Sequence, residues 1–281
     1  MRNLRRVLAL ALTVGITLTM GACGKKDAQS ANENSNVLRV GMECGYAPYN
    51  WTQLDDSNGA VKIEGTNEFA GGYDVEIAKR VAQDLGKELL VVKTDWDGLP
   101  PAVQSGKIDL IMAGMSPTPE RQKQIAFTSP YWESEYVMIV KKGSAFENAK
   151  SIQDFSGAKI SAQLNTVHYD LIDQINSVNK QEAQGTFPEL RIALQSGVID
   201  GYVAEVPEAK SVEAATDDLV AVYFNDGEGF TFDEGTNQVA AGLSLENKEL
   251  LEAVNTSIEK ISQDERFEIM DSAIANQPAN N

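Results

Sequence analysis

The sequence predicts an α/β protein that is built as two lobes, and three observations support this fold class. Short apolar runs alternate with amphipathic helical patterns, as in sheets whose faces are covered by helices. The stretch Trp96–Gly114 recurs as Phe187–Glu205, so the chain contains one helix and strand unit twice. Without residues 1–22, the chain of 281 residues still suits two lobes with cores of their own.

The two copies align without gaps, and in both an amphipathic helix ends at Ser-Gly and is followed by a strand. Gly114 and Glu205 follow these strands at equivalent positions. Ligands of open α/β sheets bind beyond the carboxyl ends of the strands. Facing lobes would therefore present an anion-binding loop and a carboxylate across a cleft, which fits a zwitterion. The residues identical in both copies are Leu99, Ala102, Gln104, Ser105, Gly106, Ile108, Asp109 and Ala113, matched by Leu190, Ala193, Gln195, Ser196, Gly197, Ile199, Asp200 and Ala204.

The stretch Asp109–Arg121 reads as a strand, a turn and the start of a helix. Thr118 is a favourable N-cap, and Pro119 suits the first helical position. Arg121 then stands at the third helical position, where its charge opposes the positive amino end of the helix dipole. An anion bound in front of both explains this placement, with Ser116 as a further donor. An ordinary surface arginine is the alternative.

The chain begins with the features of a signal peptide rather than of a domain. Three arginines lie within Met1–Arg6, and an apolar stretch too short to span a membrane follows. The ending Met20–Cys23 resembles the bacterial lipobox, in which the cysteine is diacylated and becomes the new amino terminus. We expect a signal peptide at 1–22, a palmitate-bearing Cys23, and a flexible tether at 23–36. The alternative is ordinary secretion with a free cysteine.

Charge and composition exclude several classes of function. The formal net charge is −17, and cleavage after residue 22 removes three arginines and no acid, which lowers it to −20. Nucleic-acid binding is not expected at this charge. The cysteines are Cys23 and Cys44, and His168 is the single histidine, so we expect no metal site, no cofactor and no Ser-His-Asp set. Cys44 is expected to be a small buried side chain.

The first strand, Val37–Met42, leads into a loop rich in aromatic residues. Tyr49 and Trp51 could line a ligand or pack on their own lobe. Glu43 directly follows the strand, and a carboxylate in such a position needs a partner.

The next elements predict a parallel crossover. Gln53–Phe69 reads as a polar excursion or hairpin, Asp74 as the cap of a helix that Gly86 ends, and Glu88–Lys93 as a strand. The order strand, helix, strand implies a right-handed connection.

Further motifs accompany these elements along the chain. They are Leu38–Gly41, Tyr46–Tyr49, Gly72–Ala78, Trp96–Ala102, Ser105–Asp109, Gly114–Arg121 and Phe127–Tyr131. Together they resemble the polar-amino-acid solute-binding proteins of ABC importers, and the resemblance covers nearly all of Val37–Ile261.

The resemblance implies two doubly wound α/β lobes joined by two crossover strands, a periplasmic-binding-protein-like fold of type II. Lobe 1 would comprise 37–135 and 236–281, and lobe 2 would comprise 136–235. Tyr136–Lys141 would leave the first lobe, and the segment from Tyr223 to Gly235 would return to it. The other expected elements are strands at Lys159–Ala162 and Gln238–Ser244, and helices after Thr166, at Pro207–Thr216 and from Asn247.

The resemblance also implies a binding site. Arg121 would hold the α-carboxylate of an amino acid with help from Ser116 and Thr166, while the Gly114 carbonyl and Glu205 would take the α-ammonium. The family usually has aspartate at the position of Glu205.

The ligand side chain would contact a second group of residues. Tyr46 and Tyr73 would flank it, with Glu43 near its far end. Asn165 stands where a glycine is usual, and His168 is open between a ligand contact and a helix surface.

The function implied is capture of a free L-amino acid, without catalysis, for an ABC permease and its ATPase subunit. A monomer would be lipid-anchored on the extracytoplasmic face of the bacterial cell membrane. The surplus acid Glu43 favours arginine or lysine as ligand. Glutamine is the alternative, and Lys62 or Lys93 could instead neutralise Glu43. Two other functions stay open: a dehydratase-like enzyme that uses Glu43, Glu205 or His168, and a sensory or adhesive surface module.

Overall fold

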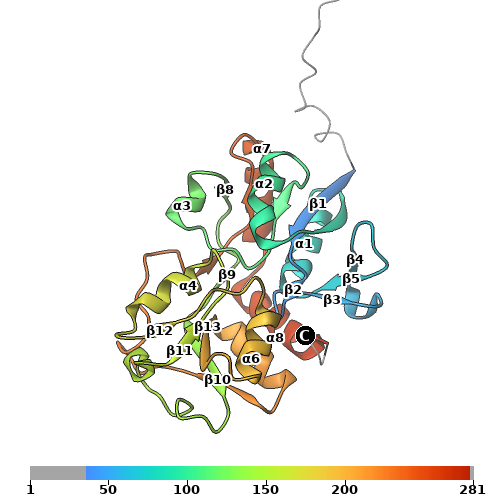
Figure 1. Ribbon diagram of the computed structural model, residues 1–281. Coiled ribbons are helices and arrows are strands. Elements are labelled where there is room, and N and C mark those ends of the chain that lie inside the picture. The colour runs from blue at the N-terminus through green and yellow to red at the C-terminus, as the bar shows by residue number, and fades with distance from the viewer. Residues whose placement is uncertain (1–35, 279–281) are drawn as a thin grey trace, which may run out of the picture. The chain divides into compact units, whose positions relative to one another are not determined.

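The computed structural model describes residues 36–278 of the chain. The predicted signal peptide, Cys23 and the tether up to Ser35 lie outside these residues. Within the described part, most strands belong to two five-stranded sheets, and each sheet carries its own helices (Figure 1). We call the elements around the first sheet lobe 1 and those around the second sheet lobe 2.

The first sheet contains the parallel strands predicted from the crossover. Strand β1 lies between β6 and β7 and is parallel to both, while β16 is antiparallel to β7 and β8. In order across the sheet, the strands are β6 (Glu88–Lys93), β1 (Val37–Met42), β7 (Leu110–Ile111), β16 (Gly242–Leu243) and β8 (Ala126–Phe127). Lobe 1 also contains α1 (Tyr73–Asp84), α2 (Leu99–Gln104), α3 (Pro119–Gln122), α7 (Lys248–Glu259) and the 3-10 turns η1 (Ser57–Gly59) and η2 (Trp96–Gly98).

The second sheet repeats this arrangement. Strand β11 lies between β12 and β13 and is parallel to both, while β10 is antiparallel to β13 and β14. In order, the strands are β12 (Asn179–Lys180), β11 (Lys159–Ser161), β13 (Gly201–Glu205), β10 (Tyr136–Lys141) and β14 (Leu219–Val222). Lobe 2 also contains α4 (Val167–Leu171), α5 (Phe187–Gln195), α6 (Val206–Ala215) and the 3-10 turns η3 (Ile152–Phe155) and η4 (Ile172–Gln174).

The two copies of the repeat have the same structure. Gly106 and Gly197 end the helices with positive φ angles of 72° and 77°, a conformation that glycine adopts without strain. The Oδ2 atom of Asp109 accepts a hydrogen bond from the Arg39 amide at 2.8 Å, and that of Asp200 accepts one from the Lys159 amide at 2.8 Å. Each aspartate therefore fastens the start of a repeat strand to its parallel neighbour.

Two segments connect the sheets. Strand β9 (Trp132–Glu133) precedes β10 and pairs antiparallel with β15 (Gln238–Val239), which follows the return from lobe 2. The predicted strand Gln238–Ser244 is therefore wrong as one element: its first part joins this connecting ribbon, and its last part is β16 of the first sheet.

A small sheet and a last helix complete the fold. The predicted hairpin is part of a four-stranded sheet in the order β2 (Gly45–Tyr46), β3 (Asn50–Gln53), β5 (Phe69–Gly71) and β4 (Val61–Lys62). Helix α8 (Gln263–Asn276), which the sequence analysis did not predict, packs on α1 and α6, and Gln277 Nε2 donates to the Ser211 carbonyl at 2.9 Å. In Figure 1 this red helix lies beside the orange α6.

Helix α7 shows how the predicted apolar stripes form the core. Asn247 caps it by accepting a hydrogen bond from the Leu250 amide at 3.1 Å. Val254 and Ile258 are fully buried against lobe 1, and each such side chain contributes about 1.5–3 kcal/mol through burial. No helix within residues 36–278 is both long and apolar enough to cross a bilayer.

One predicted helix cap is wrong. Helix α1 begins at Tyr73 with Gly72 as its N-cap, so Asp74 stands inside the first turn. Its carboxylate is fully buried and accepts hydrogen bonds from Tyr131 and Asn50. A buried carboxylate takes the strongest donors in reach, and these tertiary partners replace the local capping role.

A buried ion pair holds two helices of lobe 2 together. Arg191 of α5 donates from Nη2 and Nε to the carboxylate of Glu208 in α6 at 2.8 and 3.1 Å. The Tyr202 hydroxyl donates to the same carboxylate at 3.0 Å. Both charges are out of water, so each depends on the other.

We predict that Glu208→Ala lowers the free energy of unfolding by about 3–5 kcal/mol, because it leaves a buried guanidinium without its counter-ion. The control is Asp173→Ala, which removes the exposed partner of Lys180 and should cost less than about 1 kcal/mol. Urea unfolding followed by circular dichroism measures both. Equal losses in the two variants would contradict the prediction.

Candidate functional site

A small cavity lies between the carboxyl ends of the two sheets. Its volume is about 10 Å³, room for about one water molecule. An amino acid can enter only if side chains of the two lobes move apart. The cavity is lined by Tyr46, Trp96, Ala113, Gly114, Ser116 and Arg121 of lobe 1 and by Gln163, Thr166, Val167, His168 and Phe187 of lobe 2.

Arg121 stands where the sequence analysis placed it, at the third position of α3. Thr118 caps the helix by accepting a hydrogen bond from the Arg121 amide. The Arg121 guanidinium donates to the carbonyls of Ser116 at 2.9 Å and Asn165 at 3.0 Å, and it lies 5.0 Å from the centre of the Trp96 ring. No ion pair within residues 36–278 includes Arg121. Burial lowers its pKa to about 10, so this cation is desolvated without a carboxylate partner.

Glu205 provides the opposite charge from lobe 2. It ends β13, is 2% exposed, and accepts a hydrogen bond from the Tyr49 hydroxyl at 2.7 Å. His168 Nε2 lies 3.4 Å from its other oxygen. Tyr49 belongs to lobe 1, so the carboxylate already links the lobes.

Two buried side chains that line the cavity carry polar atoms without hydrogen bonds. His168 is 7% exposed, which excludes the helix-surface alternative. Neither of its ring nitrogens, nor the Tyr46 hydroxyl, has a hydrogen-bond partner within residues 36–278. Both side chains line the cavity. Buried polar atoms without partners are rare in folded proteins, and here they are available to a bound molecule.

Aromatic rings close the cavity from both lobes. Tyr46 stacks on Phe187 with ring centres 4.0 Å apart and planes 12° apart. Gly114 has a φ of 61°, and a Cβ atom there would lie 3.0 Å from the Tyr46 ring, so both backbone and space require glycine. The sequence analysis missed Phe187 as a site residue. It is the repeat equivalent of Trp96, which also lines the cavity, so the alignment of the two copies held the signal.

Thr166 lines the cavity, and Tyr73 does not. Thr166 donates through its hydroxyl to the Gln163 carbonyl at 2.7 Å at the start of α4. Tyr73 is fully buried in lobe 1, and its hydroxyl donates to the Tyr131 carbonyl at 2.7 Å. The structure therefore brings Tyr46, but not Tyr73, to the predicted place.

Glu43 lies beside the cavity and is hydrogen-bonded to Gln163 of the other lobe. Gln163 Nε2 donates to its Oε1 atom at 2.9 Å. Burial raises the pKa of Glu43 to about 7, the Gln163 hydrogen bond opposes this rise, and the charges of Asp95 and Asp97 add to it. Lys93 donates instead to Thr52, and no ion pair within residues 36–278 joins Glu43 to a lysine.

Asp74 positions the loops that carry the lobe 1 residues. It accepts hydrogen bonds from the Tyr131 hydroxyl at 2.6 Å, from Asn50 Nδ2 at 2.9 Å and from the Gly114 amide. Asn50 in turn accepts from the amide of Cys44, which is buried as predicted, at 2.8 Å. Burial raises the pKa of Asp74 to about 7 despite these donors. One carboxylate thus fixes both the Gly114 turn and the loop after Glu43.

Asn165 joins the lobes through both its backbone and its side chain. Its φ of 57° is a left-handed conformation that asparagine tolerates better than most residues. Its carbonyl accepts from Trp96 Nε1 at 3.2 Å and from Arg121 at 3.0 Å. Its Nδ2 atom donates to Asp97 Oδ1 at 2.8 Å. The residue therefore binds three residues of lobe 1.

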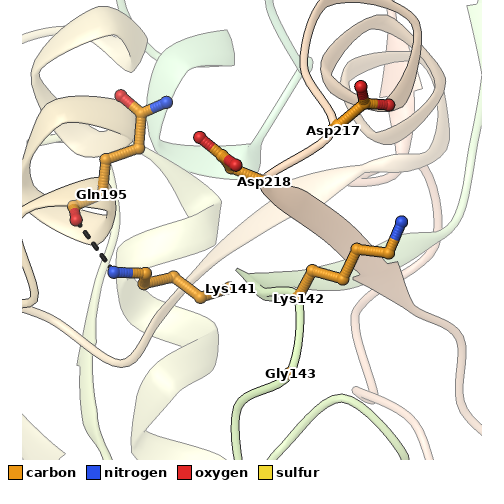
Figure 2. Close-up of a pocket in the computed structure, with 6 residues that line it drawn as sticks. All are labelled: Lys141, Lys142, Gly143, Gln195, Asp217 and Asp218. Atoms are coloured by element: carbon orange, nitrogen blue, oxygen red, sulfur yellow. Dashed lines mark hydrogen bonds between the residues drawn. The ribbon is translucent and has the colours of Figure 1, made fainter.

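A second depression lies on the surface of lobe 2, at the end of β10 (Figure 2). Its volume is about 450 Å³. Lys141 Nζ donates there to the Gln195 carbonyl at 3.0 Å, while Lys142 and the aspartates at 217 and 218 are exposed. It contains no predicted site residue, and its charges are already in water, so the interlobe cavity is the better candidate.

The fold and the cavity define a class of protein. Two α/β lobes joined by two connecting segments, with a desolvated cation and a buried carboxylate on opposite sides, form a type II periplasmic-binding-protein fold. The model of the bacterial extracellular solute-binding proteins, family 3, matches residues 38–273, and the chain belongs to this family.

Named relatives and solved structures agree with this membership. A probable histidine-binding protein of Campylobacter jejuni is 29% identical, with 93% of this chain and 95% of that protein covered. The arginine-binding extracellular protein ArtP of Bacillus subtilis is 26% identical, with 77% and 79% covered. The structure of an ancestral arginine-binding protein bound to arginine is 30% identical, with a TM-score of 0.67 and with 84% and 97% covered.

The Asn165 contacts predict a measurable bias toward the closed arrangement of the lobes. Asn165→Gly keeps the carbonyl and suits the positive φ, but it removes the bond to Asp97, and Asp97→Ala removes the same bond from the other side. We expect each variant to show a larger radius of gyration than the wild type by solution X-ray scattering without solute, because the open arrangement gains population.

The double variant should equal the single variants, since one bond is removed once. Unchanged scattering in all three proteins would contradict a role for this bond in closure.

Proposed function

We propose that this chain is the extracytoplasmic substrate-binding subunit of an ABC importer and captures a polar, cationic amino acid, arginine or lysine, between its lobes. The observation that carries this proposal is the pair formed by Arg121 and Glu205. A desolvated guanidinium on lobe 1 lines the cavity, and a buried carboxylate on lobe 2 lies 3.4 Å from His168, which also lines it. An α-amino acid carries the two complementary charges at one carbon.

The backbone part of the ligand has a partner for each charge. Arg121 would hold the α-carboxylate in a bidentate grip, with hydroxyl donors from Ser116 and Thr166. The Gly114 carbonyl and Glu205 would take the α-ammonium. All but Glu205 line the cavity, and Glu205 lies 3.4 Å from the cavity residue His168.

Binding of this kind favours closure of the lobes. The α-carboxylate of the ligand would be held by lobe 1 and by Thr166 of lobe 2. Its α-ammonium would be held by Gly114 of lobe 1 and Glu205 of lobe 2. A ligand that contacts both lobes binds the closed arrangement more tightly and shifts the population toward it. The permease would then recognise the closed protein.

The surroundings of Glu43 support a cationic side chain. Its carboxylate is half-buried, it forms no ion pair with a lysine within residues 36–278, and Asp95 and Asp97 add further negative charge that raises its pKa. A guanidinium or ammonium there would restore the balance. The stacked rings of Tyr46 and Phe187 offer cation–π contact beside it. Relatives named for arginine agree with this preference.

A catalytic alternative would use Glu43, Glu205 or His168 as acid or base, as in a dehydratase-like enzyme. Membership of a solute-binding family supports capture instead. Incubation with arginine, lysine and glutamine, followed by mass spectrometry, distinguishes the two functions, because a binding protein returns each ligand unchanged.

The remaining parts of the proposal concern the membrane. We propose that Cys23 is diacylated and anchors a monomer to the outer face of the bacterial cell membrane, where it meets its permease and ATPase. Family membership among extracellular proteins supports the location. The lipobox-like sequence before Cys23 supports the anchor. A sensory surface module would share this anchor and fold but would work without the permease.

Arg121→Ala should weaken amino-acid binding by about thirtyfold or much more, because truncation of a desolvated bidentate partner costs about 2–5 kcal/mol. Lys123→Ala is the matched control, since it removes an exposed cation two residues further along the chain. Calorimetric titration with L-arginine measures both, and circular dichroism checks the fold. Unchanged affinity in Arg121→Ala would return Arg121 to an ordinary surface role.

Because the pKa of Glu43 is raised to about 7, the affinity for a cationic ligand should depend on pH near neutrality. A cationic side chain favours the carboxylate form, so the affinity for L-arginine should rise about tenfold between about pH 6 and pH 8 as Glu43 loses its proton.

Glu43→Gln should lose this rise. The same pH profile in wild type and Glu43→Gln would show that Glu43 does not face the ligand.

Cys23→Ala should abolish acylation and leave the protein unprocessed or released from the membrane. Labelling of cells with a fatty-acid analogue, followed by fractionation, measures both effects. A wild-type protein without label would refute the lipid anchor and favour ordinary secretion.

A further inference from the structure

Gln163 is a buried amide that the proposed ligand contacts do not use. It follows β11 at the carboxyl end of the second sheet, lines the cavity and is 2% exposed. Its Nε2 atom donates to Glu43 Oε1 of lobe 1 at 2.9 Å and to the Gly185 carbonyl of lobe 2 at 3.0 Å. An amide nitrogen carries two hydrogens, so both are committed.

These bonds fix the orientation of the amide. Because Nε2 faces Glu43 and Gly185, the Oε1 atom of Gln163 is turned away from both. No hydrogen bond within residues 36–278 reaches Gln163 Oε1, and none reaches the second carboxylate oxygen of Glu43. With Glu43 ionised, two acceptor atoms are therefore left beside the cavity, and neither residue has a donor to spare.

We propose that Gln163 is a specificity-determining residue that makes this end of the cleft accept only donor groups, so that a guanidinium is chosen over a carboxamide. The inference rests on the proposed function and narrows its ligand to arginine first and lysine second. Gln163 holds one carboxylate oxygen of Glu43 by a hydrogen bond from the opposite lobe, and its own Oε1 atom adds a second acceptor.

The chemistry of the competing ligands explains the choice. A guanidinium has five N–H donors in one plane and no acceptor, so it suits a carboxylate oxygen and an amide oxygen side by side. Glutamine brings two donors and a carbonyl oxygen, and that oxygen needs a donor. The donors of Gln163 are already used, so the glutamine carbonyl would be desolvated without a partner, which a polar site discriminates against strongly.

The test compares ligands rather than stabilities. Dissociation constants for L-arginine, L-lysine and L-glutamine are measured by calorimetry on the wild type, Gln163→Met and Gln163→Asn. Methionine keeps the length of the side chain without its donors or acceptor, and asparagine keeps the amide but is too short to span Glu43 and Gly185. We expect the preference for arginine over glutamine to fall by about tenfold or more in both variants.

Asn165→Gly is the matched control. It removes a different bond between the lobes, the one to Asp97, without touching the amide or Glu43. It should weaken all three ligands by one common factor and leave the ratio between them unchanged. A purely structural role of Gln163 would give this same pattern in Gln163→Met.

The outcomes separate cleanly. A reduced ratio in the Gln163 variants and a constant ratio in Asn165→Gly support the inference. A constant ratio in the Gln163 variants, or a wild type that prefers glutamine, overturns it while the capture of amino acids stands. A wild type that binds none of the twenty amino acids in a thermal-shift screen overturns the proposed function, and this inference with it.

Discussion

The unneutralised guanidinium of Arg121 is the constraint on which the site depends. Its hydrogen bonds go to carbonyl groups, which satisfy its donors but do not neutralise its charge. Burial of this charge therefore lowers the pKa of Arg121. On the opposite lobe, Glu205 is buried, and a tyrosine hydroxyl is its one side-chain hydrogen-bond donor within residues 36–278. Each lobe thus holds a charge that the other lobe contacts through neutral groups. The proposed zwitterionic ligand would offset both, which would link recognition to closure.

The duplicated unit explains how one chain places two opposite charges at one cleft. In both lobes the repeat strand lies beside the first strand of its sheet, held there by Asp109 or Asp200. The same register then delivers the residue after each strand to the same edge. At that position one lobe has a glycine turn and the other has Glu205, while the aromatic residue that opens each copy lines the cavity.

Local rules predicted the parts of this site that depend on neighbours in sequence. Thr118, Pro119 and Arg121 obey capping and dipole rules, and the repeat predicted Gly114 and Glu205 as equivalents. Long-range partners decided the rest. Asp74 has the pattern of a helix cap, but its carboxylate accepts a hydrogen bond from Tyr131, which lies far along the chain. Tyr73 turns into the core through its own distant acceptor, and nothing in a single sequence marks these pairings.

The paired connecting strands restrict how the lobes can separate. Because β9 and β15 are hydrogen-bonded to each other, the two connecting segments form one antiparallel ribbon instead of two independent strands. A displacement of one connecting segment is therefore passed directly to the other. The contacts at Arg121, Gln163 and Glu205 then loosen in one movement. The proposed ligand contacts on the two sides of the cleft would therefore be lost together rather than one lobe at a time.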